Sequence, residues 1–491
     1  MSDFIKHWRD ILPKYAHPQL DHGPAKNRRE LIARGFMLGG GMVFAPNMFT
    51  MAAGKLYGAE LKDCSGAASA SYLPTLSVHF QGGSLFAGHF IPGAKGGQGD
   101  TLSLAALGTI GLSAVPTLDM SIGIPMDAGS SLLAGIKSVV PAAVQANMNG
   151  LLIPNVSRDD NAANDFGNIT HYLLSSGKGV PKEVAKIVGN GNGADGGRYT
   201  VSPEALTTAT PVRIQSAADA GSLVNQGRLG ELLGDNANIE KFMKMLHSSS
   251  SEQLKNLADL TEQQKLLVEC GYLKAGENLT KFTPDALSPL NDPAVTGITY
   301  TANNTFAAAD TRDDERADTI FKLAIDGYAT HGVLQIGGCD NHGSSAAQQA
   351  DKDYNSGRLI GRAFAQAAVK NLPLVMVLCS DGAKGARNGT PDANARDYIR
   401  TNSDNGARGS VVVLMYDPKG RPEVLDGDGS VGFAHQVGAF QKDGGAVDTT
   451  VGSLSNSVDN ACKFVVNQIN VLQGKPEMFD VGVPARVKPI F

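Results

Sequence analysis

Two apolar runs in the second half of the chain, LPLVMVL at Leu372–Leu378 and SVVVLMY at Ser410–Tyr416, most constrain how it can fold. Strands that are apolar without alternation are buried on both faces, so helices must cover both sides of their sheet. Helical patterns occupy Arg312–Thr330 and Ser344–Val369, with another short apolar run between them at 333–336. The order helix, strand, helix, strand, loop, strand predicts an α/β fold with a mostly parallel central sheet.

The overall composition fits a large folded protein and excludes some classes of partner. The chain has 491 residues, of which 42% are hydrophobic and 19% charged, enough for one large domain or two ordinary ones. Its net charge of −5 gives no basic footprint for nucleic acid. The five cysteines are scattered without a CxxC pair, and their odd number argues against a disulfide framework. We expect them to be small buried thiols.

The N-terminal region, residues 1–60, contains the twin arginine Arg28-Arg29 followed by a Gly-rich apolar segment. This pattern resembles a twin-arginine export signal, with cleavage near Ala53 or Ala59. It predicts a periplasmic or extracellular protein with no transmembrane helix once the signal is removed. The alternative is an amphipathic N-terminal helix with two surface arginines, which would leave the protein in the cytoplasm.

Several elements are predicted before the apolar strands. Leu73–Phe80 indicates a strand that contains His79 and ends in a tight turn at 81–84. Leu151–Ser157 indicates a second strand, and 181–188 is helical or mixed. In DAGSS at 127–131, Ser130 or Ser131 is a helix cap, because the sequence lacks the GxSxG form of a nucleophile elbow.

Residues 202–290 differ from their surroundings, being polar, rich in Leu, Lys, Glu and Gln, and helical in period. We interpret them as a helical insertion or cap in a domain that spans 70–491. This insertion is the part we expect to contact a protein partner, if the protein has one. A helix at Ser453–Leu472 is expected to close the domain.

The stretch VLQIGGCDNHGSS at 333–345 holds the clearest candidate for chemistry. An apolar strand ends in two glycines, and Asp340 and His342 follow before a long helix begins. In open α/β sheets, ligands collect at the carboxyl edge of the strands. Aspartate and histidine there are donors suited to a divalent metal. The alternative interpretation is turn formation by Asp340 and its neighbours.

The order of these motifs resembles that of the uncharacterised bacterial family called domain of unknown function 1501. The block TIFKLAIDGYATHGVLQIGGCDNHG at 319–343 matches its helix, strand and Gly-Gly-x-Asp-x-His turn. Ser380-Asp381-Gly382 corresponds to a later strand-end motif, and Asp404-Asn405-Gly406 to a turn before a further strand. The early Gly82-Gly83 and the twin arginine also agree with that family, whereas the helical insertion lies outside the resemblance.

That family is similar to the alkaline phosphatase and sulfatase superfamily, so the resemblance implies an alkaline-phosphatase-like α/β/α sandwich. It implies that Asp340, His342, Asp381 and Asp404 are the metal ligands. The metal would be zinc, manganese or calcium, polarising a phosphoryl or sulfuryl oxygen. Ser84 would be a nucleophile at a strand end, although serine is more common in such a turn as a turn-forming or capping residue.

The sequence also departs from the family pattern. Asn405 stands where the family has histidine, the Phe-Gly-Arg part after Asp381 is missing, and no Asp follows Gly83. Losing one of a few ligands can cost a site its metal. We therefore expect an exported, non-catalytic binding or assembly component with a degenerate metal site. The alternatives are a metal-dependent hydrolase of phosphate or sulfate esters, and a cytosolic small-molecule-binding protein.

Overall fold

The structure is a computed structural model, and the residues that it describes form one continuous sheet with its covering helices. These residues are 73–81, 84, 86–91, 117–156, 187–190, 212–224, 241, 287–299, 306, 310–329, 331–339, 346–380, 384–386, 401–404, 409–426, 432–433, 435–441, 447–450, 454 and 458–490. The candidate export signal lies outside them.

The described residues build a central sheet of nine strands in the order β12-β13-β4-β11-β8-β1-β7-β5-β6. The strands are β1 (Thr75–Phe80), β4 (Met148–Asn155), β5 (Ile187–Gly189), β6 (Val212–Arg213), β7 (His331–Ile336), β8 (Leu374–Ser380), β11 (Gly409–Tyr416), β12 (Gly432–Phe433) and β13 (Gln436–Val437). The strands expected near 73–80, 151–157, 333–336, 372–378 and 410–416 are all present.

Most neighbouring strands run parallel, which confirms the predicted α/β class with a mostly parallel sheet. β1 lies between β7 and β8 and is parallel to both, and β5 is parallel to β7 and β6. β11 is the main exception, since it is antiparallel to both β8 and β4. Parallel neighbours need a long crossover, whereas β8 and β11 are joined through a short antiparallel pair.

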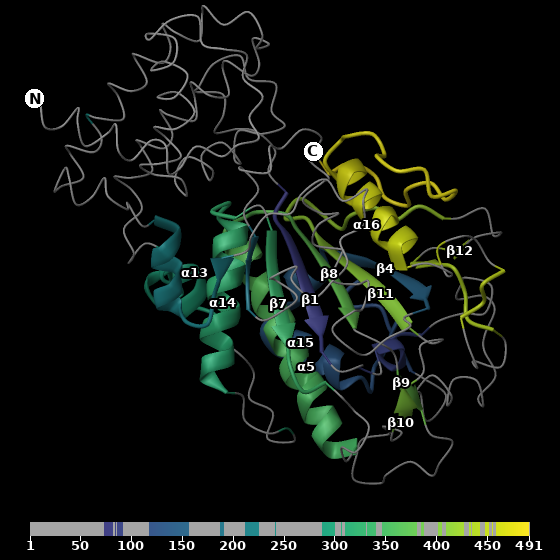
Figure 1. The fold of residues 1–491 in the computed structure, drawn as a ribbon, viewed down its shortest axis with the longest axis horizontal. Helices are drawn as coiled ribbons and strands as arrows, with labels where there is room; N and C mark the ends of the chain where they lie inside the picture. The colour runs from purple at the N-terminus through teal and green to yellow at the C-terminus, as the bar shows by residue number, and fades with distance from the viewer. Residues whose placement is uncertain are drawn as a thin grey trace, which may run out of the picture.

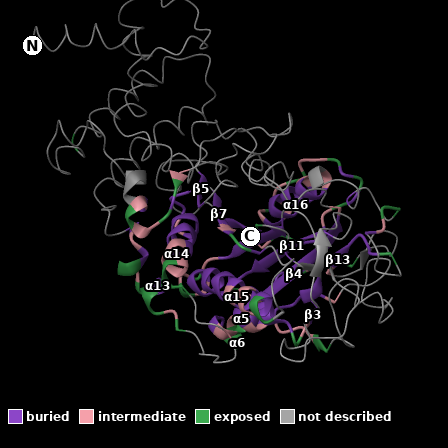
Figure 2. Ribbon diagram, turned by 60° about the horizontal axis from the view of Figure 1, so that its bottom comes forward, coloured by how far each residue is buried: buried purple, intermediate pink, exposed green. Residues whose placement is uncertain are grey.

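Helices cover both faces of the sheet, as the apolar strands require (Figure 1 and Figure 2). One face packs against α5 (Ser131–Val139), α14 (Thr311–Ile325) and α15 (Ala346–Val369). The other face packs against α16 (Val458–Leu472). The helices expected at 312–330, 344–369 and 453–472 are thus confirmed, with slightly different ends.

Glycines allow α5 and α15 to cross at very short range. A Cβ added at Gly135 would lie 2.0 Å from the carbonyl oxygen of Tyr354, and one at Gly357 would lie 2.0 Å from that of Leu132. Neither oxygen can move without distorting its helix. These two positions therefore need glycine for the backbones to touch.

Charged side chains join α14 to α15 along their length. Arg358 binds Asp314, and Arg362 binds Asp318, in each case through both carboxylate oxygens. The paired residues are one helical turn apart on each helix, so the contacts form a ladder. Gln366 adds a hydrogen bond to Asp318 of 2.9 Å.

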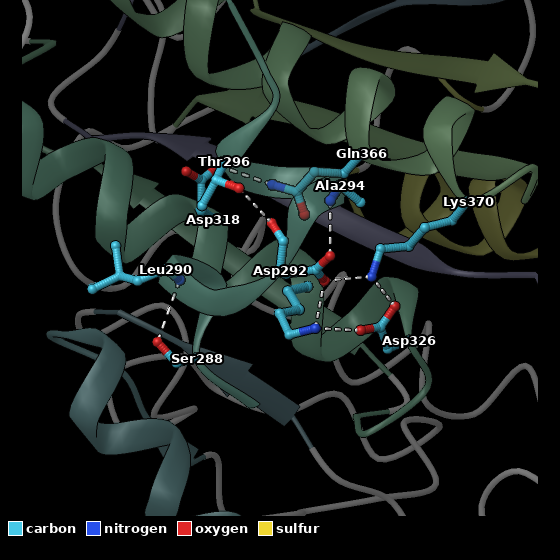
Figure 3. Close-up of polar contacts among 10 residues, drawn as sticks. Ser288, Leu290, Asp292, Ala294, Thr296, Asp318, Asp326, Gln366 and Lys370 are labelled. Carbon is cyan, nitrogen blue, oxygen red and sulfur yellow. Dashed lines mark hydrogen bonds and ion pairs between the residues drawn. The ribbon is translucent and has the colours of Figure 1, made fainter. Parts of the chain in front are cut away.

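A ring of four charges ends this ladder and ties in the short helix α13 (Pro293–Thr296) (Figure 3). Asp292 accepts from Lys322 at 2.5 Å and from Lys370 at 2.8 Å. Asp326 accepts from the same two lysines at 2.9 and 2.5 Å. Because each charge has two opposite neighbours, the pKa of Asp292 is lowered to about 2 although partial burial opposes the shift.

The remaining described elements are short. They are η2 (Phe86–His89), β2 (Leu118–Asp119), β3 (Met126–Asp127), α6 (Ala142–Gln145), η4 (Ala217–Val224), η5 (Pro289–Asn291), β9 (Lys384–Ala386) and β10 (Thr401–Asp404). β2 and β3 pair with each other, as do β9 and β10.

Two details revise the expected boundaries. Ile187 and Val188 belong to a strand, β5, where the sequence indicated a helical or mixed segment. β6 lies within 202–290 but is the edge strand of the central sheet, so the sheet already includes residues assigned to the insertion. Most of that insertion lies outside the described residues. Across the portion that is described, no helix has the length and apolar character needed to span a membrane.

Candidate functional site at the carboxyl edge of the sheet

The carboxyl ends of β7, β1 and β8 are tied together at one edge of the sheet. Gln81, directly after β1, donates its backbone N–H to the carbonyl of Ile336 at 2.9 Å. The carbonyl of Gln81 accepts in turn from the N–H of Cys339 at 2.9 Å. The chain after β1 is therefore held against the chain after β7, immediately before Asp340 in the sequence.

Ser380, the last residue of β8, joins the same edge from the other side of β1. Its hydroxyl donates to the carbonyl of Phe80 at 3.2 Å and accepts from the backbone N–H of Ser84 at 2.8 Å. These bonds fix the position of Ser84 beside the point where β8 leads into Asp381. Ser84 is itself only 3% exposed.

Two buried hydroxyls at this edge have unused hydrogen-bonding capacity within the described structure. They are Ser84 Oγ and Ser410 Oγ, neither of which has a hydrogen-bond partner. Ser410 is near the start of β11, and that strand runs opposite to β8, so its start lies at the end of β8. A buried hydroxyl without a partner is costly, so such atoms indicate a place for a ligand or water.

The predicted metal ligands are only partly placed. Asp340, His342 and Asp381 lie outside the described residues, so their expected convergence stays a prediction. Asp404 is the last residue of β10, in a two-stranded sheet separate from the central one. Its partner in the register is Lys384 of β9. Among the side chains that the structure does describe, no group of three or more His, Cys, Asp or Glu could hold a metal ion.

The described cysteines are buried, as expected. They are Cys339, Cys379 and Cys462. Cys339 donates its thiol to the carbonyl of Ile336 at 3.3 Å, which adds to the bonding at the end of β7.

A buried polar row on the α16-side face of β1 and β7 was not predicted. Thr75 Oγ1 lies 3.0 Å from His331 Nδ1, and Ser77 Oγ lies 2.9 Å from His331 Nε2. His79 follows two residues later on the same face, and its Nε2 has no hydrogen-bond partner in the described structure. The sequence singled out His79 only as a member of a strand, and gave His331 no role.

Burial controls the protonation of both imidazoles. It lowers the pKa of His79 to about 4. It also lowers the pKa of His331 to about 3, with a further contribution from the neighbouring His79. Both side chains are therefore neutral at physiological pH, and the hydroxyls of Thr75 and Ser77 match a neutral ring, which has one donor and one acceptor.

A second polar set lies on the opposite face and was also missed. His89 Nδ1 lies 2.9 Å from Ser130 Oγ, and His89 Nε2 lies 3.4 Å from Asp353 Oδ2. Ser130 is the N-cap of α5, which confirms that part of the sequence prediction. Because the three residues come from η2, the start of α5 and α15, no local pattern in the sequence links them.

Comparison of the sequence with models of known protein families finds no match. Comparison with curated proteins finds no match either. The likeness to a family therefore rests on the motifs quoted above.

Proposed function

We propose that this chain is an exported protein with an alkaline-phosphatase-like fold and a degenerate metal site, and that it acts as a binding or assembly component. The coarse architecture supports the proposal, since a mostly parallel sheet lies between helical layers. The ends of β7, β1 and β8 support it as well, because they are joined at the carboxyl edge, where open α/β sheets usually bind ligands.

The observation that carries the proposal is the position of Asp404. Its backbone partner is Lys384 in the two-stranded β9–β10 sheet, which is separate from the central sheet. Asn405 removes the imidazole that the family has at the next position, and losing one of a few ligands can cost a site its metal.

Metal content of the purified full-length chain tests this proposal, with Asp340→Ala as the matched control. We expect zinc, manganese and calcium well below one equivalent per chain, and no change in the variant. One equivalent of any of them in the native chain, lost in Asp340→Ala, would show an intact site and overturn the proposal.

Export is tested separately by fractionating bacterial cells and sequencing the N-terminus of the recovered protein. We expect a mature chain that begins after Ala53 or Ala59 in the periplasmic fraction. Replacing Arg28 and Arg29 with lysine should leave the full chain in the cytoplasm. A native chain that keeps its first residues in the cytoplasm would favour the alternative of a cytosolic small-molecule-binding protein.

One observation favours the second candidate, a metal-dependent hydrolase of phosphate or sulfate esters. Ser84 Oγ is buried at the carboxyl edge of the sheet without a partner in the described structure, and the hydroxyl of Ser380 holds the backbone N–H of Ser84. A nucleophile needs such a fixed position and a free hydroxyl. Hydrolysis of p-nitrophenyl phosphate or sulfate that depends on added metal and disappears in Ser84→Ala would establish this candidate.

A further inference from the structure

The set formed by Ser130, His89 and Asp353 has the connectivity of a nucleophile with its base. Ser130 has extended backbone angles, φ −62° and ψ 122°, and its Oγ accepts the backbone N–H of Leu133 at 3.1 Å. With that bond in place, its own proton is available to His89 Nδ1, 2.9 Å away. An N-cap alone would not need an imidazole at this distance.

Asp353 completes the set on the other side of the ring. Its Oδ2 lies 3.4 Å from His89 Nε2 but makes no hydrogen bond within the described structure, although the residue is only 2% exposed. Hydrogen bonds of catalytic groups are often long before substrate binds. A proton on Nε2 facing this carboxylate leaves the lone pair of Nδ1 directed at Ser130.

An independent observation is a buried amide without a partner among the described residues, on the helix that carries Asp353. Gln349 is 1% exposed, and neither its Nε2 nor its Oε1 has a partner in the part of the chain that is described. It lies one turn before Asp353 on α15, so the two side chains are on the same helix face. A buried amide with both atoms unpaired is costly unless something polar fills the space.

We propose that Ser130 is a nucleophile activated by His89 and oriented by Asp353, forming an esterase site for small carboxylic esters. Ser130, His89 and Asp353 are 3%, 1% and 2% exposed, so the acyl group that enters must be small. Here Nδ1 faces the serine and Nε2 faces the aspartate, the opposite of most serine hydrolases. This does not change the chemistry, because either ring nitrogen can accept the proton.

The reaction balances with water as the only co-reactant. Ser130 Oγ bonds to the ester carbon while its proton moves to His89 Nδ1. The ester C–O bond then breaks, and the same proton passes to the departing alkoxide. Water attacks the acyl-serine, gives one proton to Nδ1, and Ser130 Oγ leaves and regains that proton. The N-terminus of α5, a helix of nine residues, stabilises the negative charge of each tetrahedral intermediate.

The test treats the native full-length chain with a small alkyl fluorophosphonate and maps the adduct by mass spectrometry. We expect one adduct per chain, on Ser130, formed at the same rate with or without a chelator. His89→Gln should slow labelling at least about a hundredfold, the usual contribution of a general base. Ser131→Ala is the matched control and should label like the native chain.

Two results would overturn the proposal. One is a folded native chain whose Ser130 remains unlabelled, and the other is equally fast labelling of Ser130 in a folded His89→Gln chain. Ser130→Gly keeps most of the capping energy and should abolish the adduct, so thermal melting can confirm that this variant is folded. Metal content does not enter either result, so failure here is distinguishable from failure of the proposed function.

Discussion

Acidification from pH 7 to pH 5 should destabilise this protein through His79 and His331. The pKa values of these imidazoles are lowered to about 4 and about 3, against 6.5 for an exposed histidine. The unfolded chain therefore binds protons first as the pH falls. The stability that the two neutral imidazoles contribute is fully present above pH 6.5. It is lost as the pH falls from there towards their pKa values in the folded protein.

The size of the effect follows from the difference in proton binding. Each imidazole costs about 1.4 kcal/mol for each pH unit below 6.5, or about 2 kcal/mol at pH 5. The two together cost about 4 kcal/mol, a large part of the stability of a typical domain. Asp292 does not add to this window, because its lowered pKa removes stability only between about 4 and about 2.

Urea unfolding at pH 7 and pH 5 measures the loss directly, in the native chain and in a variant with His79→Gln and His331→Gln. Glutamine keeps a polar group at each position but cannot be protonated. The variant should be less stable at pH 7 and should lose about 4 kcal/mol less than the native chain on going to pH 5. An identical loss in both proteins would show that these imidazoles are not buried and neutral, and would refute the argument.

Three further predictions test packing and the candidate site. Gly357→Ala should lower stability by about 1–3 kcal/mol or more, since the new Cβ meets the carbonyl oxygen of Leu132, and a thermal melt unchanged within error would contradict the close crossing. Asp292→Asn should lower the free energy of unfolding by about 3–5 kcal/mol, because two partly buried lysines lose a shared carboxylate. Urea denaturation measures this loss, and a value below about 1 kcal/mol would show that solvent screens the ring of four charges. Ser84→Ala should leave the melting temperature unchanged, because the deleted hydroxyl has no partner among the described residues, and a large drop would show that it has a structural role.

Much of the sheet could be predicted from the sequence because long apolar runs define their own strands. Leu374–Ser380 and Gly409–Tyr416 are buried on both faces. Their nearly unbroken apolar composition predicts this burial without reference to the rest of the chain. The short strands at 187–189 and 212–213 could not be predicted, since two or three residues show no period.

The sequence does contain a signal for the antiparallel direction of β11. The segment between β8 and β11 is charged and rich in Gly and Asn, without the helical pattern that a parallel crossover needs. That segment instead contains the β9–β10 pair, which returns the chain to the same edge.

No local sequence pattern could reveal the polar contacts between segments that are distant in the chain. Thr75 and His331 are 256 residues apart, and His89 and Ser130 are 41 residues apart. Each of these side chains looks ordinary in its own segment. Their roles follow only from a topology that places β1 beside β7, and η2 beside α5.

The most direct test of the central claim is a calorimetric titration of the metal-free, full-length chain with zinc, manganese and calcium. The degenerate site proposed here predicts no stoichiometric binding at micromolar metal, and the same flat trace for Asp381→Asn. One-to-one binding by the native chain that disappears in Asp381→Asn would contradict the claim and establish a working metal centre at the carboxyl edge of the sheet.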